Sequence, residues 1–362
     1  MSLRQDMLRA ARRAKAALPD AGAAVTFVRG QALPDGGFRD RSGKADLYYT
    51  VFGLQCLLAL DALDGPAAGL SAEPTPPKQP LPPSAAAAPL LRRTGRLRRP
   101  EALAKAEAAG YSRPCAERYL GSFGDPRGLD LVHAACLARC WALVRPRHPA
   151  GRAGAGRALV ERIESFRSAE GGYNPVAGSA AGSAYGCFLA LGAWQDLGRE
   201  PPDAAGIVRC VRSLRIAGGG YTNEASLPFA SAPATAAAAL VLAELGQPAD
   251  ESAAAYLLNC VHPSGGLVAM IGAPAADLLS TATGLHALAR MGAPPDPSAP
   301  SSAAAAAPLP LRRVDAAAAL GFVAGLMLED GGFRGSQDDR AADCEYTFYG
   351  LLALGHLAGG PA

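Results

Sequence analysis

The sequence predicts an all-α fold, an α/α toroid of six helical hairpins in which an inner ring of six helices lies within an outer ring of six. One motif recurs along the chain: a pair of glycines, a short loop, an Asp or Ser, and then an apolar helix. The motifs recur about every 45 residues, a period typical of arrays of helix pairs. Abundant Ala and Gly also favour close helix packing over strands.

The two clearest copies of the motif lie at the ends of the chain, over residues 36–54 and 331–354. In each copy the Gly pair can adopt the positive φ that ends a helix, and the Asp after the loop can cap the next helix. The later turns are marked by Gly124, Gly172, Gly220, Gly266 and Gly332. Their separations are 48, 48, 46 and 66 residues, and the last is longer because a Pro/Ala tract intervenes.

The first two helix pairs are separated by a long insertion. Helices are expected at 23–30 and 46–62, joined by the loop that contains Gly36 and Gly37. A Pro-rich, low-complexity stretch at about 65–100 has no apolar period, and ordered sequence is expected to return over 100–109. The second pair is degenerate, with helices at 115–123 and 130–144.

The other four pairs are regular. We expect helices at 157–167 and 183–197, at 205–215 and 231–245, at 252–261 and 277–291, and at 316–328 followed by a helix from Asp343. A second low-complexity insertion occupies about 293–312. The chain from 1 to 362 is therefore predicted to be a single domain that carries two insertions.

Small residues in the inner helices favour a closed ring over an open superhelix. Gly53, Gly284 and Gly350 each follow the capping Asp of their helix by seven residues. Glycines repeated at one depth would let helices crowd around a narrow centre, whereas the concave face of an open solenoid tolerates larger side chains. Closure would make the first and last units neighbours.

Composition excludes several classes of protein. The longest apolar run, at 236–242, is far shorter than the roughly 20 residues of a membrane helix, so no membrane span is expected. The chain begins with basic, helix-forming residues and lacks the apolar core of a secretion signal, so we expect a cytoplasmic protein. A formal net charge of +3 gives no reason to expect a nucleic-acid partner.

Cysteines and histidines mostly fall within apolar helical patterns. None of the eight cysteines forms a C-x-x-C pair, so we expect reduced, buried thiols. His133, Cys136 and Cys140 share one helix face, for which a packed face is favoured over a metal site. His286 and His356 are expected in the core.

In a closed ring, the inner helices run the same way and their N-termini gather at one mouth. Each of these helices starts at a residue that can cap it: Asp46, Asp130, Ser183, Ser231, Asp277 and Asp343. The partial positive charges and free N–H groups of the six N-termini should attract anions to this mouth.

The first and last units resemble the β subunits of protein prenyltransferases, most closely those of the Rab geranylgeranyl type. The resemblance rests on G-G-F-x-D-R-x-G-x-x-D-x-x-Y-T-x-F-G-L in the first unit and G-G-F-x-G-x(7)-D-x-x-Y-[ST]-F in the last. More distantly, the units are similar to squalene–hopene-type cyclases, which share the toroid. The similarity covers all six units and is strong in the first and last.

The resemblance implies a zinc site. In that family, an Asp and a Cys of one inner helix and a His of the next hold a zinc ion that activates the acceptor thiolate. Asp343 matches the Asp ligand, Glu345 stands at the Cys position, and Tyr49 stands at the His position. Asp343 and Glu345 are therefore the predicted metal ligands, a pair that suits a harder cation better than zinc.

The resemblance also implies a prenyl diphosphate site. Tyr346 matches a diphosphate-contacting Tyr, and Arg340 matches a Lys of the family. Basic side chains cluster in the first and last loops, and tyrosines near them are expected to line the funnel. The predicted substrate-binding residues are Arg39, Arg41, Lys44, Arg340, Tyr48 and Tyr346.

Each candidate also has a structural interpretation. Helix capping alone explains Asp343, and the helix dipole alone favours Glu345 in the first turn. The tyrosines can be ordinary packing, and the basic side chains solvated surface. Asp338–Asp339 resembles half of the acidic D-x-D-D motif of the cyclases, but it falls in a loop.

The leading prediction is a prenyltransferase-like enzyme that binds an isoprenoid diphosphate in a central funnel and transfers the prenyl group. Asp343, Glu345 and Tyr49 would form its reaction centre, and zinc would be its cofactor. The family also implies a helical α-type partner subunit. Two alternatives stay open: a non-catalytic toroid that serves as a scaffold or binding module, and a terpene cyclase of the squalene type.

Overall fold

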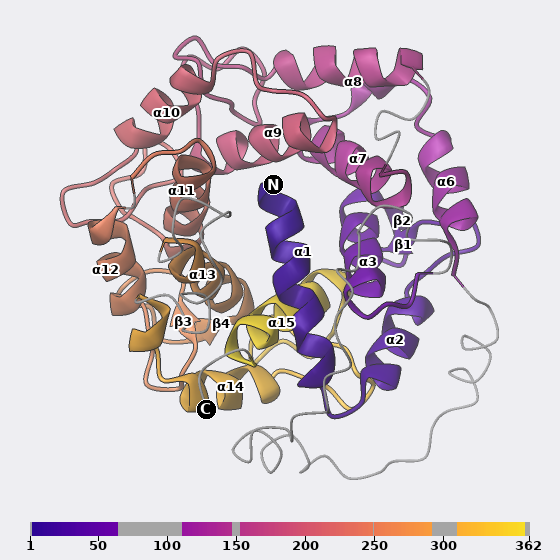
Figure 1. Ribbon diagram of the computed structural model, residues 1–362, viewed down its shortest axis with the longest axis vertical. Helices are drawn as coiled ribbons and strands as arrows, with labels where there is room; N and C mark the ends of the chain where they lie inside the picture. Colours follow the sequence, from indigo (N-terminus) through magenta and orange to yellow (C-terminus); the bar gives the residue numbers. More distant parts are fainter. Residues whose placement is uncertain (1, 64–110, 147–152, 249, 292–309, 359–362) are drawn as a thin grey trace, which may run out of the picture.

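The chain forms a closed ring of inner helices. A computed structural model describes residues 2–63, 111–146, 153–248, 250–291 and 310–358. The inner helices are α3 (Leu47–Ala59), α7 (Leu131–Val144), α9 (Ala184–Asp196), α11 (Ala232–Glu244), α13 (Leu278–Met291) and α15 (Cys344–Leu357). Each packs on the next, and α15 packs on α3 (Figure 1). The predicted α/α toroid and its closure are therefore confirmed.

Six further helices form the outer ring. They are α2 (Ala21–Gly30), α6 (Arg113–Gly121), α8 (Ala153–Glu164), α10 (Ala204–Ser213), α12 (Glu251–Asn259) and α14 (Ala316–Ala324). Short antiparallel ladders join β1 (Phe38–Arg39) to β2 (Ala45–Asp46) and β3 (Leu267–Val268) to β4 (Ala276–Asp277). The stretch at 100–109, where order was expected to return, and the tract at 65–100 lie outside the described residues. So does the tract at 293–312 except for its last residues, where η4 (Leu311–Arg313) is a short 3₁₀ helix.

A Gly pair turns the outer helix into its inner partner in five of the six units, as predicted, and the second unit has Gly124 alone at that place. Gly331 has a φ of +92°, and a Cβ there would lie 2.5 Å from the backbone of Ala23. Gly332 passes under the ring of Phe27, which a Cβ would meet at 2.6 Å. The last turn therefore packs against α2 of the first unit, and only glycine fits these two positions.

The glycines inside the inner helices serve a purpose other than the predicted one. A Cβ on Gly53 would lie 2.4 Å from the ring of Phe38, and one on Gly350 would lie 2.5 Å from the ring of Phe333. These glycines make room for the side chain that follows the Gly pair of their own unit. They do not crowd the helices around the centre, so the closure was predicted for a wrong reason.

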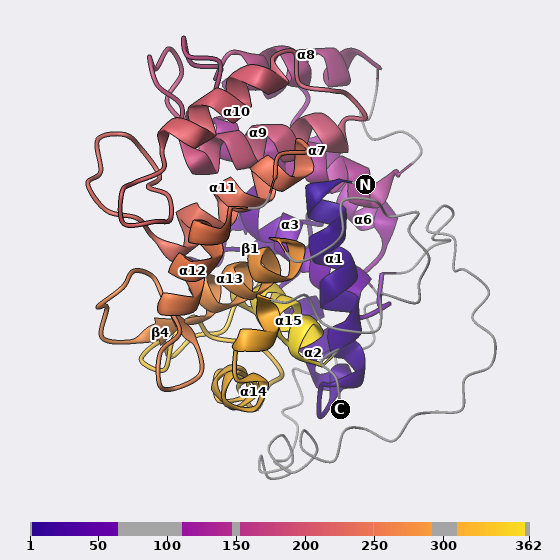
Figure 2. The same ribbon diagram turned by 60° about the vertical axis from the view of Figure 1, so that its left-hand side comes forward.

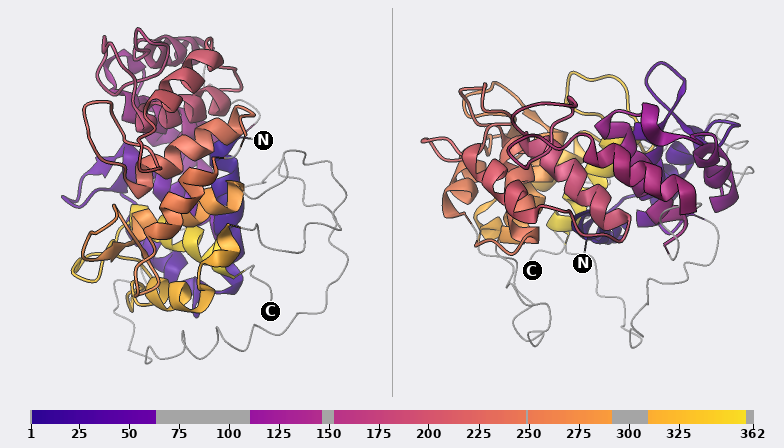
Figure 3. Two further views of the ribbon diagram at one scale, coloured as in Figure 1. Left: turned by 90° about the vertical axis from the view of Figure 1, so that its left-hand side faces the viewer. Right: turned by 90° about the horizontal axis from the view of Figure 1, so that it is seen from above.

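The opening segment forms α1 (Leu3–Arg13), whose position the sequence analysis did not anticipate. α1 packs on α15, α3, α9 and α11 at the C-terminal ends of the inner helices. Figures 2 and 3 show it along one face of the ring, while the loops that precede the inner helices project from the opposite face. The ring is therefore covered at one end and has its mouth at the other.

Arginines of α1 bind the C-terminal turns of the inner helices. Arg12 donates to the carbonyl oxygen of Leu58 at 3.4 Å, and Arg13 donates to that of Gly355 at 3.0 Å. Such carbonyl groups lack partners within their helix and carry partial negative charge. A Cβ on Gly355 would lie 1.8 Å from the carbonyl oxygen of Ala10, so the two backbones are in direct contact.

Within the described residues, no helix is long and apolar enough to cross a membrane.

Candidate functional site

The six predicted N-caps are all in place at the mouth. Asp46, Ser183 and Asp343 accept from the backbone N–H three residues further on, as do the caps of the other three inner helices, Asp130, Ser231 and Asp277. The caps satisfy donors that would otherwise be free at each helix start. Capping is therefore the function that all six residues share.

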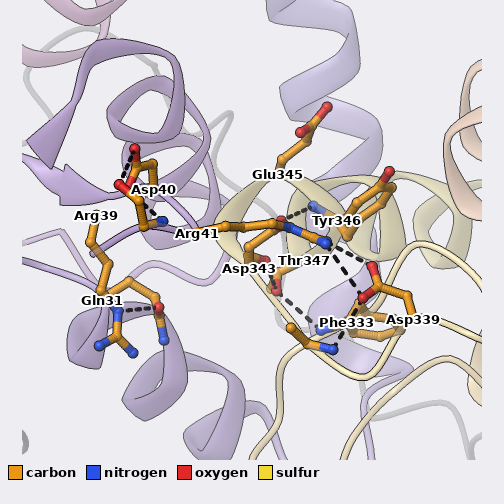
Figure 4. A network of polar contacts seen from close by, with 12 residues as sticks. Gln31, Arg39, Asp40, Arg41, Phe333, Asp339, Asp343, Glu345, Tyr346 and Thr347 are labelled. Carbon is orange, nitrogen blue, oxygen red and sulfur yellow. Dashed lines mark hydrogen bonds and ion pairs between the residues drawn. The ribbon is translucent and has the colours of Figure 1, made fainter. Parts of the chain in front are cut away.

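Arg41 joins the first unit to the last at this mouth. Its guanidinium lies 2.8 Å from Oδ2 of Asp343 and 2.7 Å from Oδ2 of Asp339, and it covers the ring of Tyr346 (Figure 4). Asp343 is 5% exposed, so its carboxylate is nearly enclosed between Arg41 and the start of α15. Its two carboxylate partners raise the pKa of Arg41. The predicted meeting of the two end units is confirmed.

Glu345 points away from this ion pair (Figure 4). The hydroxyl of Tyr48, on α3, donates to Oε1 of Glu345 at 2.5 Å. Burial raises the pKa of Glu345 to about 7, although the hydrogen bond from Tyr48 opposes that shift. A carboxyl with this pKa is partly protonated near neutral pH, so Glu345 can either donate or accept a proton.

Aromatic side chains surround Glu345. The ring of Phe52 lies 4.9 Å from that of Tyr48 and 5.5 Å from that of Tyr349. Tyr185, on α9, is 37% exposed, yet burial raises the pKa of its hydroxyl to about 12, with a further contribution from the charge of Glu345. The charge interactions of Tyr185 with Tyr48, Tyr349 and Glu345 place its ring in the same cluster, on a part that solvent reaches. We call this cluster, made of Tyr48, Phe52, Tyr185, Glu345 and Tyr349, the bowl.

Arg4 of α1 closes the bowl from below. Its guanidinium donates to the carbonyl oxygen of Ala135 at 3.0 Å and lies 3.3 Å from Asp196, which Arg139 also binds at 2.9 Å. The charge of Arg4 acts on the hydroxyl of Tyr185, so the two side chains are near one another. All three charged groups are buried, and each has a partner, which buried charges require.

His133 lies at the mouth between two carboxylates. Its Nε2 is 3.5 Å from Oδ2 of Asp46, and its Nδ1 is 2.8 Å from Oδ2 of Asp130. The interaction with Asp46 raises the pKa of His133 to about 9, and Asp130 adds to the shift. Cys136 and Cys140 are buried as expected, whereas His133 is not part of that packed face. It ties the start of α7 to the start of α3.

The remaining predicted site residues are dispersed. Arg39 donates to Oε1 of Gln31 at 2.8 Å and points away from Arg41 (Figure 4). Lys44 and Arg340 have exposed side chains on the first and last loops. Tyr49 lies at the mouth, where burial and then the charge of Asp343 raise its pKa to about 12. Of the predicted basic cluster, only Arg41 reaches across to the other unit.

Asp343 and Glu345 do not converge on one point as ligands of a metal ion would. Asp343 binds Arg41, Glu345 binds Tyr48, and the two side chains point apart (Figure 4). The residues that the structure describes contain no group of three or more His, Cys, Asp or Glu side chains that could hold a metal. The arrangement does not fit tetrahedral zinc coordination.

Sequence reasoning did not assign four residues to the site. Tyr185 stands in no motif, and Phe52 stands in the motif of the first unit without an assigned role. The role of both appears only when helices from different units face one another. Arg4 belongs to a segment outside the repeats, so no periodic signal marked it. His133 did carry a signal, because it follows Asp130 by three residues, a spacing that places its ring beside the capping carboxylate.

Two other features lie apart from the bowl. His286 and His356 are buried, and their rings share a hydrogen bond at 2.9 Å, as expected for core residues. An open, polar pocket of about 510 Å³ lies on the outside of the ring, beside Arg167 and Asp203 of the third and fourth units. Neither feature contacts Glu345 or Arg41.

A family model of the prenyltransferase alpha-alpha toroid domain matches residues 6–81, 247–315 and 301–359, which together make up more than half of the chain. Comparison with curated protein sequences finds no match.

Solved structures share the fold over nearly the whole chain. The type II terpene cyclase MstE from Scytonema, in its apo form, aligns with a TM-score of 0.54 at 12% identity, over 96% of this chain and 98% of that one. A variant of MstE in complex with geranylgeranyl dihydroxybenzoate, its substrate, aligns with a TM-score of 0.52 at 14% identity, over 97% and 98%. A protein from Actinoplanes aligns with a TM-score of 0.50 at 16% identity, over 94% and 99%. At these identities the likeness shows the fold.

Proposed function

Since the chain belongs to the family of prenyltransferase α/α toroid domains, we propose that it binds an isoprenoid diphosphate or a similar amphiphile, with the apolar tail in the bowl. The observation that carries the proposal is the bowl itself, an aromatic cluster on the inner helices, with α1 packed across the C-terminal ends of those helices. An apolar chain gains by leaving water for such a cluster, and a polar head stays at the mouth. The finer resemblance to Rab geranylgeranyl transferases is retained as part of this proposal.

The head group would lie at the helix N-termini, near Arg41. A diphosphate there would compete with Asp339 and Asp343 for the guanidinium, because both carboxylates already bind it. Lys44 and Arg340, which have exposed side chains on the same two loops, can turn toward the head group. Transfer of the prenyl group would then require these cations to stabilise the departing diphosphate.

Binding is tested with geranylgeranyl diphosphate and with geranylgeraniol, its uncharged counterpart, by isothermal titration calorimetry. We expect saturable binding of both, with higher affinity for the diphosphate. Tyr185→Ala should weaken both ligands by roughly tenfold because it removes apolar surface, while Phe123→Ala, just after the outer helix α6, should leave them unchanged. Arg41→Gln should weaken the diphosphate alone, and Arg127→Gln, on another exposed loop, should not. Absence of saturable binding of either ligand would favour the scaffold alternative.

A second candidate function, protonation-initiated cyclisation, is favoured by one observation. Glu345 is an acid with a pKa of about 7 inside an aromatic bowl. Its proton would add to a double bond of the tail, which leaves a carboxylate on Glu345 and a carbocation beside the rings of Tyr48 and Phe52. Aromatic faces stabilise cations that lie within about 6 Å of the ring centroid. After ring closure, the cation would lose a proton to water, which gives a neutral alkene. Asp339 binds Arg41, and the motif Asp338–Asp339 has no role in this route.

The two reactions differ in the fate of the diphosphate. Prenyl transfer breaks its bond to the tail and releases it, whereas protonation of a double bond retains it on a cyclised product. Mass spectrometry of a reaction with geranylgeranyl diphosphate therefore separates them. Glu345→Gln should abolish cyclisation, and Asp338→Asn should not affect it.

Three expectations remain predictions within this proposal: the metal ion at Asp343 and Glu345, the helical α-type partner, and the cytoplasmic location. Elemental analysis of the purified protein tests the first of these. No step proposed above uses a metal ion.

A further inference from the structure

One hydrogen bond holds the turn to the inner helix in most units. The N–H of the residue that follows the Gly pair donates to Oγ1 of a threonine four positions after the N-cap. These bonds join Phe38 to Thr50 at 2.9 Å, Tyr221 to Thr235 at 2.9 Å, Leu267 to Thr281 at 2.8 Å and Phe333 to Thr347 at 3.1 Å. In the third unit, the acceptor is Sγ of Cys187, which Tyr173 approaches at 3.4 Å.

A second repeated contact covers the second glycine of the turn. An aromatic ring from the next outer helix lies against it: Tyr119 on Gly37, Tyr256 on Gly220, Phe322 on Gly266 and Phe27 on Gly332. At Gly172, the covering side chain is instead Cys210 of α10. The third unit therefore departs from the repeat at two positions, and both departures introduce a thiol.

These two departures meet. The Sγ atoms of Cys187 and Cys210 lie 3.8 Å apart, and both side chains are buried. Gly182 is a third departure from the repeat. It directly precedes the N-cap of α9, and in the first, fourth, fifth and sixth units that position is an alanine. A Cβ on Gly182 would lie 2.5 Å from Sγ of Cys210, so this glycine leaves room for the sulfur. Three sequence changes thus build one small space around two thiols.

We propose that Cys187 and Cys210 form a reversible disulfide, which links the inner helix α9 of the third unit to the outer helix α10 of the fourth. The sulfurs need to approach from 3.8 Å to about 2.0 Å, a shift that side-chain rotation and the space beside Gly182 can supply. No other pair of thiols in the described part of the chain is drawn together in this way: Cys56 points its Sγ at the carbonyl oxygen of Cys344.

A peroxide is the class of oxidant that a buried pair can meet, because it is small. Cys210 accepts the hydrogen bond from Cys187 and reacts first. Its thiolate attacks one peroxide oxygen, the O–O bond breaks, and water leaves, which gives a sulfenic acid. The sulfur of Cys187 then displaces the hydroxyl of that sulfenic acid as a second water, and the S–S bond forms. Two thiols lose two electrons, and one hydrogen peroxide takes them.

The test uses the full chain, purified under reducing conditions and then exposed to hydrogen peroxide in slight excess. Free thiols are trapped with N-ethylmaleimide in acid and urea, and the non-reduced tryptic digest is examined by mass spectrometry. We expect the peptide with Cys187 joined to the peptide with Cys210 in most molecules, and dithiothreitol should separate them. The midpoint of urea unfolding should be higher for the oxidised protein than for the reduced one.

Cys187→Thr is the matched variant because it restores the threonine of the other units. It should fold as the wild type does, form no cross-link, and show the same urea midpoint with and without peroxide. Cys260→Ala removes a buried thiol elsewhere and should leave the cross-link intact. Recovery of Cys187 and Cys210 as alkylated thiols after oxidation would overturn the proposal. So would their oxidation to separate sulfinic acids, or a cross-link that forms only in unfolded protein.

Discussion

Glu345 is a first-turn residue of α15 whose environment, rather than its position along the helix, gives it an unusual acidity. Side chains at helix starts are normally exposed to solvent and stabilised as anions by the helix dipole. Here burial raises the pKa of the carboxyl group and outweighs the hydrogen bond from Tyr48, and the charge of Asp343 adds to the shift. The result is a pKa raised from 4.5 to about 7.

This shift predicts a pH-dependent stability. Because the folded protein holds the proton more tightly than the unfolded chain does, the free energy of unfolding falls as pH rises from 4.5 to about 7. The loss should be about 2–3 kcal/mol, and Glu345→Gln should not show it. Urea unfolding at pH 5 and pH 8 measures the difference between the two proteins.

Glu251→Gln is the control for that experiment, since Glu251 is an exposed carboxyl in the first turn of the outer helix α12. An equal pH dependence in wild type and Glu345→Gln would show that Glu345 is charged and solvated in the folded protein. The acid role proposed for it would then be lost.

At the residue scale, the sequence predicted local chemistry well and partners poorly. The capping role of Asp343 follows from its place before an apolar helix, so it could be predicted without knowledge of the fold. The partner of Glu345 could not, because Tyr48 is almost 300 positions away and meets it only when the ring closes. Gly53 within an apolar helix indicated that another group approaches the helix closely. The sequence did not show that this group is the ring of Phe38.

At the element scale, α1 is the part that covers one end of the ring of inner helices. It is not one of the repeated hairpins, and its amphipathic sequence does not say which surface it covers. In the structure, Arg12 and Arg13 bind C-terminal carbonyl groups of α3 and α15. Arg4 contacts both α7 and α9. α1 thus covers the C-terminal ends of inner helices, which the repeated hairpins do not cover themselves.

Gly355→Ala tests the docking of α1. The added Cβ would lie 1.8 Å from the carbonyl oxygen of Ala10, so α1 must move away from α15. We expect a loss of about 1–3 kcal/mol in the free energy of unfolding and faster tryptic cleavage within α1. Urea unfolding and limited proteolysis measure the two effects.

Gly321→Ala provides the matched comparison. Gly321 lies within α14, and a Cβ there would have nothing within 4 Å. This change should stabilise the protein by about 0.5–1 kcal/mol, because alanine favours a helix over glycine. If Gly355→Ala behaved like Gly321→Ala, α1 would not be docked on α15 as described.

At the scale of the whole molecule, the decisive feature is that this array of repeats is closed, because its last unit packs on its first. In an open array each unit contacts only its neighbours, and terminal units can be removed at a modest cost. In this ring α15 packs on α13, on α3 and on α1, and Arg41 of the first unit binds Asp343 of the last. The last hairpin therefore supports the first as directly as it supports the fifth.

A chain that ends at Arg313, without α14 and α15, should for this reason lose cooperative folding altogether. Removal of α14 and α15 exposes the faces of α3 and α13 that pack on α15, and it takes away the helix on which α1 packs most. The loss in the free energy of unfolding should be comparable to the whole stability of a typical domain, about 5–15 kcal/mol. Circular dichroism during urea unfolding should show a shallow, non-cooperative change, while a chain that ends at Leu357 should unfold as the full chain does. A truncated protein that kept a sharp transition with a slightly lower midpoint would behave as an open solenoid. The seam between α15 and α3, and the bowl that depends on it, would then not be needed for the rest of the fold.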